Sequence, residues 1–181
     1  ARAPRFHFGA AYELQARGES LAHGAWLYAG VSRDVGAALR LGGRLAFAYR
    51  APGAFDTTDV SLRTDELSLR AMAVAEVTLG TRGALALAAG GGIDLVTASP
   101  HANDTARVEA DAPVMRALPV ARAEAGVVLR VSERVRVYGA LSFEAELSGA
   151  RYYVDRAGTA EFVSSPWSLR PGGAAGVELT F

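Results

Sequence analysis

The sequence predicts an all-β fold of eight antiparallel strands, and three observations lead to this prediction. Apolar residues alternate with polar or small ones along most of the 181 residues, which is the pattern of strands with two unlike faces. Clusters of Gly, Pro, Asp and Ser interrupt the alternation and predict turns or loops. The longest uncharged strand-like stretch, 83–93, has roughly eleven residues, whereas a membrane-spanning helix needs ~20. We therefore expect a single domain, residues 1–181, folded as an up-and-down meander.

The first half of the chain contains four predicted strands, which cover 5–15, 25–33, 37–49 and 66–79. The connections between them are a polar segment, a tight turn and a loop, at 16–24, 34–36 and 51–64. The third strand shows the alternation most clearly, because Leu45 and Phe47 share one face and Arg44 and Ala46 the other. The second strand is less regular, with Trp26 on the face opposite the aliphatic residues.

The second half contains the other four predicted strands, which cover 84–96, 118–131, 135–148 and 168–181. The remaining connections are 80–83, 97–113, 132–134 and 149–166. Short turns therefore alternate with longer loops, and strands of about ten residues joined in this way are typical of transmembrane β-barrels. The last strand ends on Phe181, with Val177 and Leu179 on the same face.

The polar face of the strands predicts which side of a barrel meets water. In a soluble eight-stranded barrel this face would be outside and almost wholly polar, but here Gly and Ala are frequent on it. In a membrane barrel it lines the lumen, where small residues make room for Arg, and an Arg turned into lipid would cost about 2–4 kcal/mol near the midplane. Eight strands enclose a lumen just wide enough for side chains to fill. The charged residues predicted to plug it are Glu13, Arg40, Arg44, Arg70, Glu76, Asp94, Arg122, Glu124, Arg130, Arg136, Glu144, Glu146, Arg170 and Glu178.

The eight alternating strands, the charged lumen and the closing Val177, Leu179 and Phe181 together resemble the small outer-membrane β-barrels of the OmpA/OmpX/OmpW-like group. This resemblance implies the outer membrane of a Gram-negative bacterium, with periplasmic termini and turns and four longer extracellular loops. It also implies contact with lipid and lipopolysaccharide, and insertion by the barrel assembly machinery, which reads the last strand. Ala1–Pro4 leads us to expect an export signal removed upstream.

The resemblance does not define one activity, because such barrels serve many functions. We expect a structural or protein-binding role in the cell envelope, with another envelope protein as partner. The alternatives are a narrow pore for small solutes and a lipid-modifying enzyme. The zero net charge gives no reason to expect nucleic acid as a partner.

Few residues outside the predicted lumen point to a specific chemistry, and we expect no catalysis, metal or cofactor. The absence of Cys excludes thiol chemistry. His23, near Ser20 and Glu19, is the best candidate for a lipid-modifying site, and His7 and His101 are assigned no role. The acidic loop residues lack the spacing of a calcium loop; they are Asp56, Asp59, Asp65, Asp104, Glu109 and Asp111. Aromatic residues of the last loop either anchor the rim or form a contact surface for a protein or glycan; they are Tyr152, Tyr153, Phe162 and Trp167.

Overall fold

The computed structural model describes the backbone of residues 3–17, 20–56, 60–102, 113–148, 152–156, 159–164 and 168–181, and side chains within 3–17, 21–51, 61–101, 113–148 and 168–181. The strands in these ranges are β1 (Arg5–Arg17), β2 (Ser20–Asp34), β3 (Leu39–Asp56), β4 (Val60–Leu79), β5 (Gly83–Ala102), β6 (Val114–Arg130), β7 (Val135–Glu146), β8 (Tyr152–Arg156), β9 (Thr159–Ser164) and β10 (Leu169–Thr180). No helix that is long and apolar enough to cross a bilayer occurs in this part of the chain.

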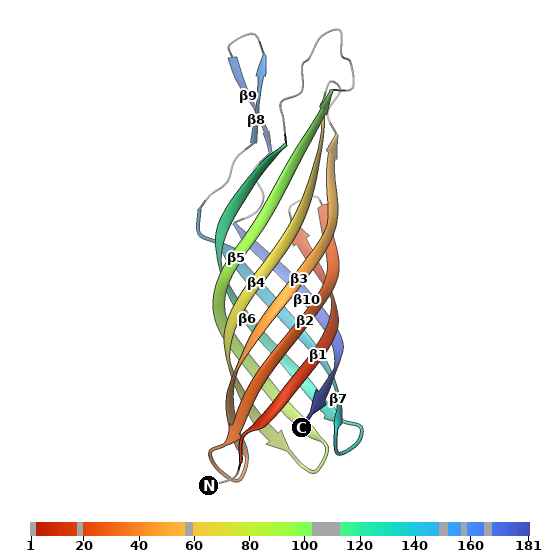
Figure 1. Ribbon diagram of the computed structural model, residues 1–181, viewed down its shortest axis with the longest axis vertical. Helices are drawn as coiled ribbons and strands as arrows, with labels where there is room; N and C mark the ends of the chain where they lie inside the picture. The colour runs from red at the N-terminus through yellow and green to blue at the C-terminus, as the bar shows by residue number, and fades with distance from the viewer. Residues whose placement is uncertain are drawn as a thin grey trace.

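Eight of these strands close into one antiparallel barrel, as the sequence predicts (Figure 1). Each barrel strand pairs with its neighbour in the chain, and β1 pairs with β10 to close the cylinder. Strands β8 and β9 form a separate hairpin in the connection between β7 and β10. Both termini lie at one end of the barrel, which we call the terminal end, and the β8–β9 hairpin lies at the other, the loop end (Figure 1).

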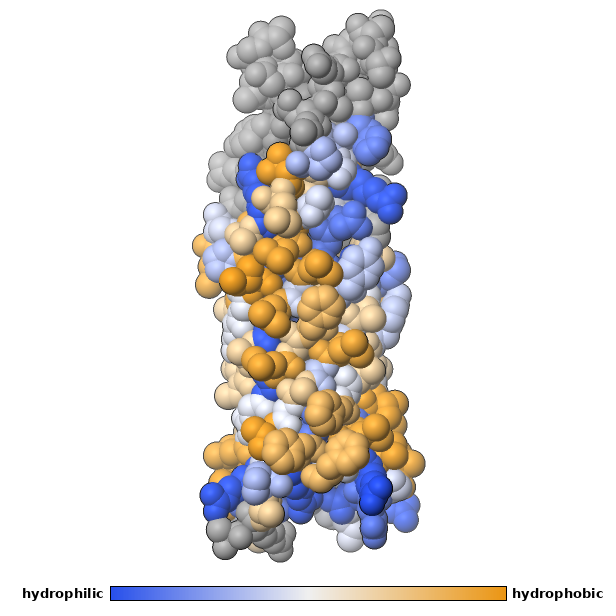
Figure 2. Space-filling model, in the orientation of Figure 1, coloured by the Kyte–Doolittle hydropathy of each residue, from blue (hydrophilic) through white to orange (hydrophobic). Residues whose placement is uncertain are grey.

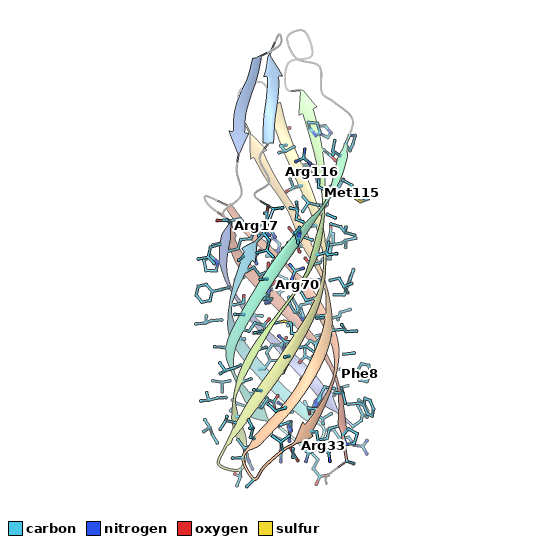
Figure 3. All side chains as sticks on the ribbon, turned by 90° about the vertical axis from the view of Figure 1, so that its left-hand side faces the viewer. Phe8, Arg17, Arg33, Arg70, Met115 and Arg116 are labelled. Carbon is cyan, nitrogen blue, oxygen red and sulfur yellow. The ribbon has the colours of Figure 1, made fainter. Side chains whose placement is uncertain are left out.

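The outer face of the barrel is apolar. Leu45 and Leu141 point outward and are 62% and 68% exposed, so the side assigned to them from the alternation is correct. Figure 2 shows orange, hydrophobic residues over the middle of the visible face and hydrophilic ones nearer its ends. Phe8 lies on the outside of the wall in Figure 3, whereas Arg70 lies within it. The surface therefore matches the apolar band that a membrane barrel presents to lipid.

Several barrel strands extend further toward the loop end than the alternation predicted. β3 and β4 run through most of the expected 51–64 loop, with a shift of register between Arg50 and Gly53. A β-bulge of this kind accommodates the turn-forming residues, because it absorbs an irregular position without ending the ladder. β2 likewise begins at Ser20, within the expected 16–24 connection, and β5 continues to Ala102. The hairpin β8–β9 was expected as loop.

The second strand, whose faces were the least regular, places its aromatic residues inside. Trp26 is 2% exposed and packs with Tyr28, Met72 and small residues of neighbouring strands in a buried cluster. Leu27, between the two aromatic residues, points outward. The interior therefore contains an aromatic layer as well as charges.

Candidate functional site in the barrel interior

Small residues opposite the arginines make room for them inside the barrel. Arg70 on β4 lies opposite Gly92 on β5, and Arg122 on β6 lies opposite Gly90. A Cβ atom at Gly92 would collide with the carbonyl oxygen of Leu69, because β4 and β5 approach closely there. The alternation of small and long inward residues thus has a steric cause.

Glu144 on β7 is the centre of the charged interior. It is fully buried, and its Oε1 accepts hydrogen bonds from Nη1 of Arg122 at 2.7 Å, Nη2 of Arg50 at 3.1 Å and Nη2 of Arg70 at 3.2 Å. Its Oε2 accepts a hydrogen bond from Nε2 of Gln15 at 2.7 Å. One carboxylate therefore links side chains from β1, β3, β4 and β6 across the lumen.

Asp94 on β5 is a second fully buried carboxylate with several donors. Its Oδ1 accepts hydrogen bonds from Nη2 of Arg70 at 2.5 Å and Oγ of Ser68 at 2.7 Å. Its Oδ2 accepts one from Nη1 of Arg170 at 3.1 Å, and Arg170 also pairs with Glu146. Because buried charges are tolerated only when paired and hydrogen-bonded, this arrangement is the one that the low-dielectric lumen requires.

Four charged residues of the interior were not predicted. Asp34 lies near the terminal end, and the other three lie near the loop end. Arg50 on β3 pairs with Glu66 and donates to Glu13 at 2.9 Å, and Arg17 pairs with Glu66 at 2.5 Å. Arg50 and Glu66 continue the inward alternation of β3 and β4, but both were placed at or beyond the expected strand ends. Extending the alternation of inward and outward residues by one further inward position on each strand would have included both.

Six arginines and six carboxylates in this half of the barrel form six ion pairs when each residue is counted once. The pairs are Arg17–Glu66, Arg44–Glu124, Arg50–Glu13, Arg70–Asp94, Arg122–Glu144 and Arg170–Glu146. We call these twelve residues the ionic plug. They include nine of the predicted lumen residues, and their formal charges cancel.

Aromatic rings border the ionic plug toward the terminal end. The guanidinium of Arg122 lies 4.1 Å from the ring centroid of Trp26, and that of Arg44 lies 5.3 Å from the ring of Tyr28. Cation–π contacts at these distances are favourable, particularly where water is excluded. Tyr28 and Tyr138 meet edge to face, with centroids 5.8 Å apart.

A second group of charges lies between the aromatic layer and the terminal end. Nε of Arg40 donates to Asp34 at 2.9 Å and its Nη1 to Glu76 at 3.2 Å. Arg136 donates to Glu76 at 2.6 Å and pairs with Glu178 at 3.1 Å. A cavity of about 60 Å³ lies between this group and the aromatic layer, with room for several water molecules.

Arg130 is the one predicted lumen residue that the interior does not bury. It shares the inward parity, but it is the last residue of β6, lies at the mouth of the terminal end and is exposed. Its cross-strand neighbour is Arg136, whose carboxylate partners are Glu76 and Glu178. The prediction that Arg130 lies in the lumen was wrong because the alternation assigns a residue to one side of a strand but does not show where along the strand the lumen ends.

The other candidate residues do not converge on a site within the described side chains. His23 faces outward and forms a 2.5 Å hydrogen bond with the Tyr12 hydroxyl, and His101 is exposed. Asp65 accepts a 3.3 Å hydrogen bond from Tyr49. No group of three metal-ligating side chains occurs among the described residues. The candidates outside the described side chains are Glu19, Ser20, Asp56, Asp59, Asp104, Glu109, Asp111, Tyr152, Tyr153, Phe162 and Trp167.

No protein-family model matches the sequence, and no curated protein matches it. Solved structures of other proteins have a similar fold, and three of them are described here. A major outer membrane protein from Thermus thermophilus is 14% identical, with a TM-score of 0.72 and coverage of 99% of this chain and 100% of the other. Ail, the attachment invasion locus protein of Yersinia pestis, is 13% identical, with a TM-score of 0.54 and coverage of 98% and 97%. Neisserial surface protein A is 15% identical, with a TM-score of 0.52 and coverage of 98% and 97%.

At these identities the similarity concerns the fold. The barrel order, the apolar outer face and the similar structures agree with the resemblance found in the sequence. This chain has the fold of the small eight-stranded outer-membrane β-barrels, the OmpA/OmpX/OmpW-like group.

Proposed function

We propose that this protein is an integral outer-membrane barrel whose lumen is closed by the ionic plug and whose role is carried by residues at the loop end. That role is structural or protein-binding, in the envelope of a Gram-negative bacterium, with the terminal end in the periplasm. The observation that supports it best is the burial of Glu144 among three arginines from three different strands. A hydrated ion cannot pass such a site without separating these pairs, which costs several kcal/mol for each unpaired buried charge.

The outer face supports the same proposal. Large apolar side chains are exposed on every barrel strand, which is unfavourable in water but suits contact with lipid and lipopolysaccharide. Phe181 lies on this face at the terminal end, where its ring meets that of Phe8 edge to face at 6.1 Å. Val177 and Leu179 are exposed beside it, so the three residues form an apolar row that the barrel assembly machinery can read. Among the similar structures, Ail is named for attachment and invasion, which fits a role at the cell surface.

Conductance across a planar lipid bilayer tests the plug. We expect no steady current from the purified wild-type protein. In a double variant that combines Arg70→Ala with Glu144→Ala, we expect channel openings. Leu45→Ala is the matched control, because it shortens an outward side chain and leaves the lumen unchanged. If the wild-type protein gave a steady current that large lumen-blocking solutes abolished, the plugged lumen would be refuted and the alternative, a narrow pore, would be supported.

The interaction role is tested by exchanging the 149–167 connection for a short turn. The barrel strands do not pair with β8 or β9, so we expect the variant to fold and to keep the heat-dependent gel mobility typical of closed barrels. An envelope protein cross-linked to the wild-type protein in native membranes should be lost from the variant. Cross-linking that is identical in the two proteins would refute a role for this connection.

A further inference from the structure

Three side chains near the terminal end are ordered as a nucleophile, a base and an acid. Nε2 of His7 on β1 lies 2.5 Å from Oγ of Ser32 on β2. Nδ1 of the same imidazole lies 3.1 Å from Oε1 of Glu178 on β10. If Nδ1 carries the proton and donates it to the carboxylate, Nε2 is free to accept the proton of the serine hydroxyl. This is the relation of serine, histidine and acid that activates a serine for nucleophilic attack, and it recurs on unrelated folds.

The acid is held in place from two further sides. Tyr28 donates its hydroxyl proton to Oε2 of Glu178 at 2.8 Å, and Nη1 of Arg136 lies 3.1 Å from Oε1. His7 is 6% exposed, so the wall of the barrel restricts the motion of its ring. Thr180, at 3.3 Å from Nδ1, is a second neighbour of the imidazole. The geometry is therefore fixed by side chains from several strands.

Open space adjoins the serine. Ser32, His7 and Glu178 all line the cavity of about 60 Å³ described above. The residue opposite Ser32 on β3 is Gly42, and a Cβ atom there would collide with the Ser32 side chain. The absence of a side chain at position 42 thus keeps room beside the hydroxyl.

The cavity also contains cationic donors for a developing negative charge. Arg40 and Arg44 flank Gly42 on the inward face of β3 and line the same cavity. The buried Nε of Arg44 has no hydrogen-bond partner among the described residues. Donors that are already in place can stabilise an oxyanion as it develops.

We propose that Ser32, His7 and Glu178 form a catalytic triad that hydrolyses small acyl esters, which reach the cavity from the terminal end. Ser32 Oγ forms a bond to the acyl carbon while its proton passes to Nε2 of His7. The ester C–O bond then breaks, and the alcohol leaves with that proton. Water next attacks the acyl carbon and gives a proton to Nε2. The bond between Ser32 Oγ and the acyl carbon breaks, the carboxylic acid is released, and Oγ takes the proton back from Nε2. Glu178 is the positioning residue for the imidazole, and the small cavity restricts the substrate to short acyl chains.

Covalent labelling by methanesulfonyl fluoride, which is small enough for this cavity, tests the proposal on the detergent-solubilised full chain. The serine oxygen bonds to sulfur, the S–F bond breaks, and the serine proton and fluoride are lost to solvent. We expect one adduct, located on Ser32 by peptide mass spectrometry, and hydrolysis of p-nitrophenyl acetate but not of p-nitrophenyl decanoate. Ser32→Ala should abolish both signals, and His7→Gln should slow labelling on the order of 100-fold or more. Ser142→Ala is the matched control, because Ser142 is a buried lumen serine for which no histidine contact is found among the described residues.

Variants of Glu178 separate catalysis from structure. Glu178→Gln should slow the labelling of Ser32, and Glu178→Asp should restore part of the rate. Gel mobility, measured in parallel, reports whether each barrel has closed. If the three residues only tie β1, β2 and β10 together, the folded wild-type protein will show no adduct on Ser32. That result overturns the proposal, whatever labelling rates the variants show. Equal rates of adduct formation in wild type and Ser32→Ala also overturn it.

Discussion

Replacing Glu144 by Gln removes one negative charge from the ionic plug and preserves the size of the side chain. The wild-type carboxylate is fully buried and accepts hydrogen bonds from Arg50, Arg70 and Arg122 at 2.7–3.2 Å. The amide leaves these three guanidinium groups with one counter-charge fewer, in a place that water does not reach. Removing one partner of a buried ion pair costs about 3–5 kcal/mol, so we expect the free energy of unfolding to fall by that amount.

Urea unfolding of the protein from lipid vesicles measures this loss, and in a Trp167→Phe background the fluorescence of buried Trp26 reports the lumen. Glu133→Gln, in an exposed turn, is the control and should change the free energy of unfolding by less than about 0.5 kcal/mol. Adding Arg70→Gln to the Glu144 variant should cost less than the two single changes combined, with a coupling of about 0.5–3 kcal/mol. A Glu144 variant as stable as wild type, or strictly additive changes, would show that the charges do not act as one network.

Three further changes test the wall, the packing and the last strand. Leu45→Arg places a charge on the lipid side and should destabilise the barrel in bilayers by about 2–4 kcal/mol, with a smaller effect in detergent; equal effects would contradict a lipid-facing position. Gly92→Ala forces a Cβ atom against the Leu69 carbonyl oxygen and should lower the free energy of urea unfolding by roughly 1–3 kcal/mol, whereas an unchanged value would refute the close approach. Phe181→Ala should slow insertion by reconstituted assembly machinery, followed as the fraction of heat-modifiable protein, and an unaltered rate would exclude the terminal aromatic residue as a signal.

The alternation along the strands was sufficient to predict the barrel and the outward side of Leu45 and Leu141, because a period of two assigns each residue to one face. It was not sufficient to predict where the strands end. Pro52 and Gly53 looked like the start of a loop, but the ladder between β3 and β4 continues beyond a bulge there. Arg50 was omitted from the lumen for that reason. Glu66 is the first residue of the predicted fourth strand and was not counted on its polar face.

The partners of the charged residues could not be predicted from parity either, since they depend on the register of strands far apart in the chain. His7 and Glu178 meet only because β1 and β10 close the barrel, with Gly9 opposite Glu178. Ser32 joins them because β2 places Gly30 opposite His7. His7 and Glu178 were on the polar faces of their strands in the sequence, and Ser32 was on the face of the second strand opposite its aliphatic residues. Nothing local indicates that the three touch. In the sequence the apparent candidate is instead His23, because Glu19 and Ser20 are close to it in the chain.

The two halves of the lumen follow from what the inward positions carry. Toward the loop end they hold long charged side chains in balanced pairs, which fill the space. Toward the terminal end they hold Gly30, Gly42, Ala86, Gly126 and Ala140, which leave the cavity open, together with the second group of charges. Passage through the barrel therefore requires both the ionic plug and the second group of charges to open, whereas chemistry at the cavity requires access only past the second group, from the terminal end.

The two properties should consequently vary independently. Glu144→Gln should change stability or conductance while the labelling rate of Ser32 stays within about twofold of wild type, because Glu144 is not among the residues that line the cavity. Ser32→Ala should abolish labelling without opening a conducting path. Labelling of wild type, Glu144→Gln and Ser32→Ala in the same vesicles, with conductance recorded from each preparation, makes the comparison. If Glu144→Gln suppressed labelling as strongly as Ser32→Ala while gel mobility showed a closed barrel, the plug and the cavity would have to be one coupled unit, because only a coupled rearrangement could transmit the lost charge to the serine.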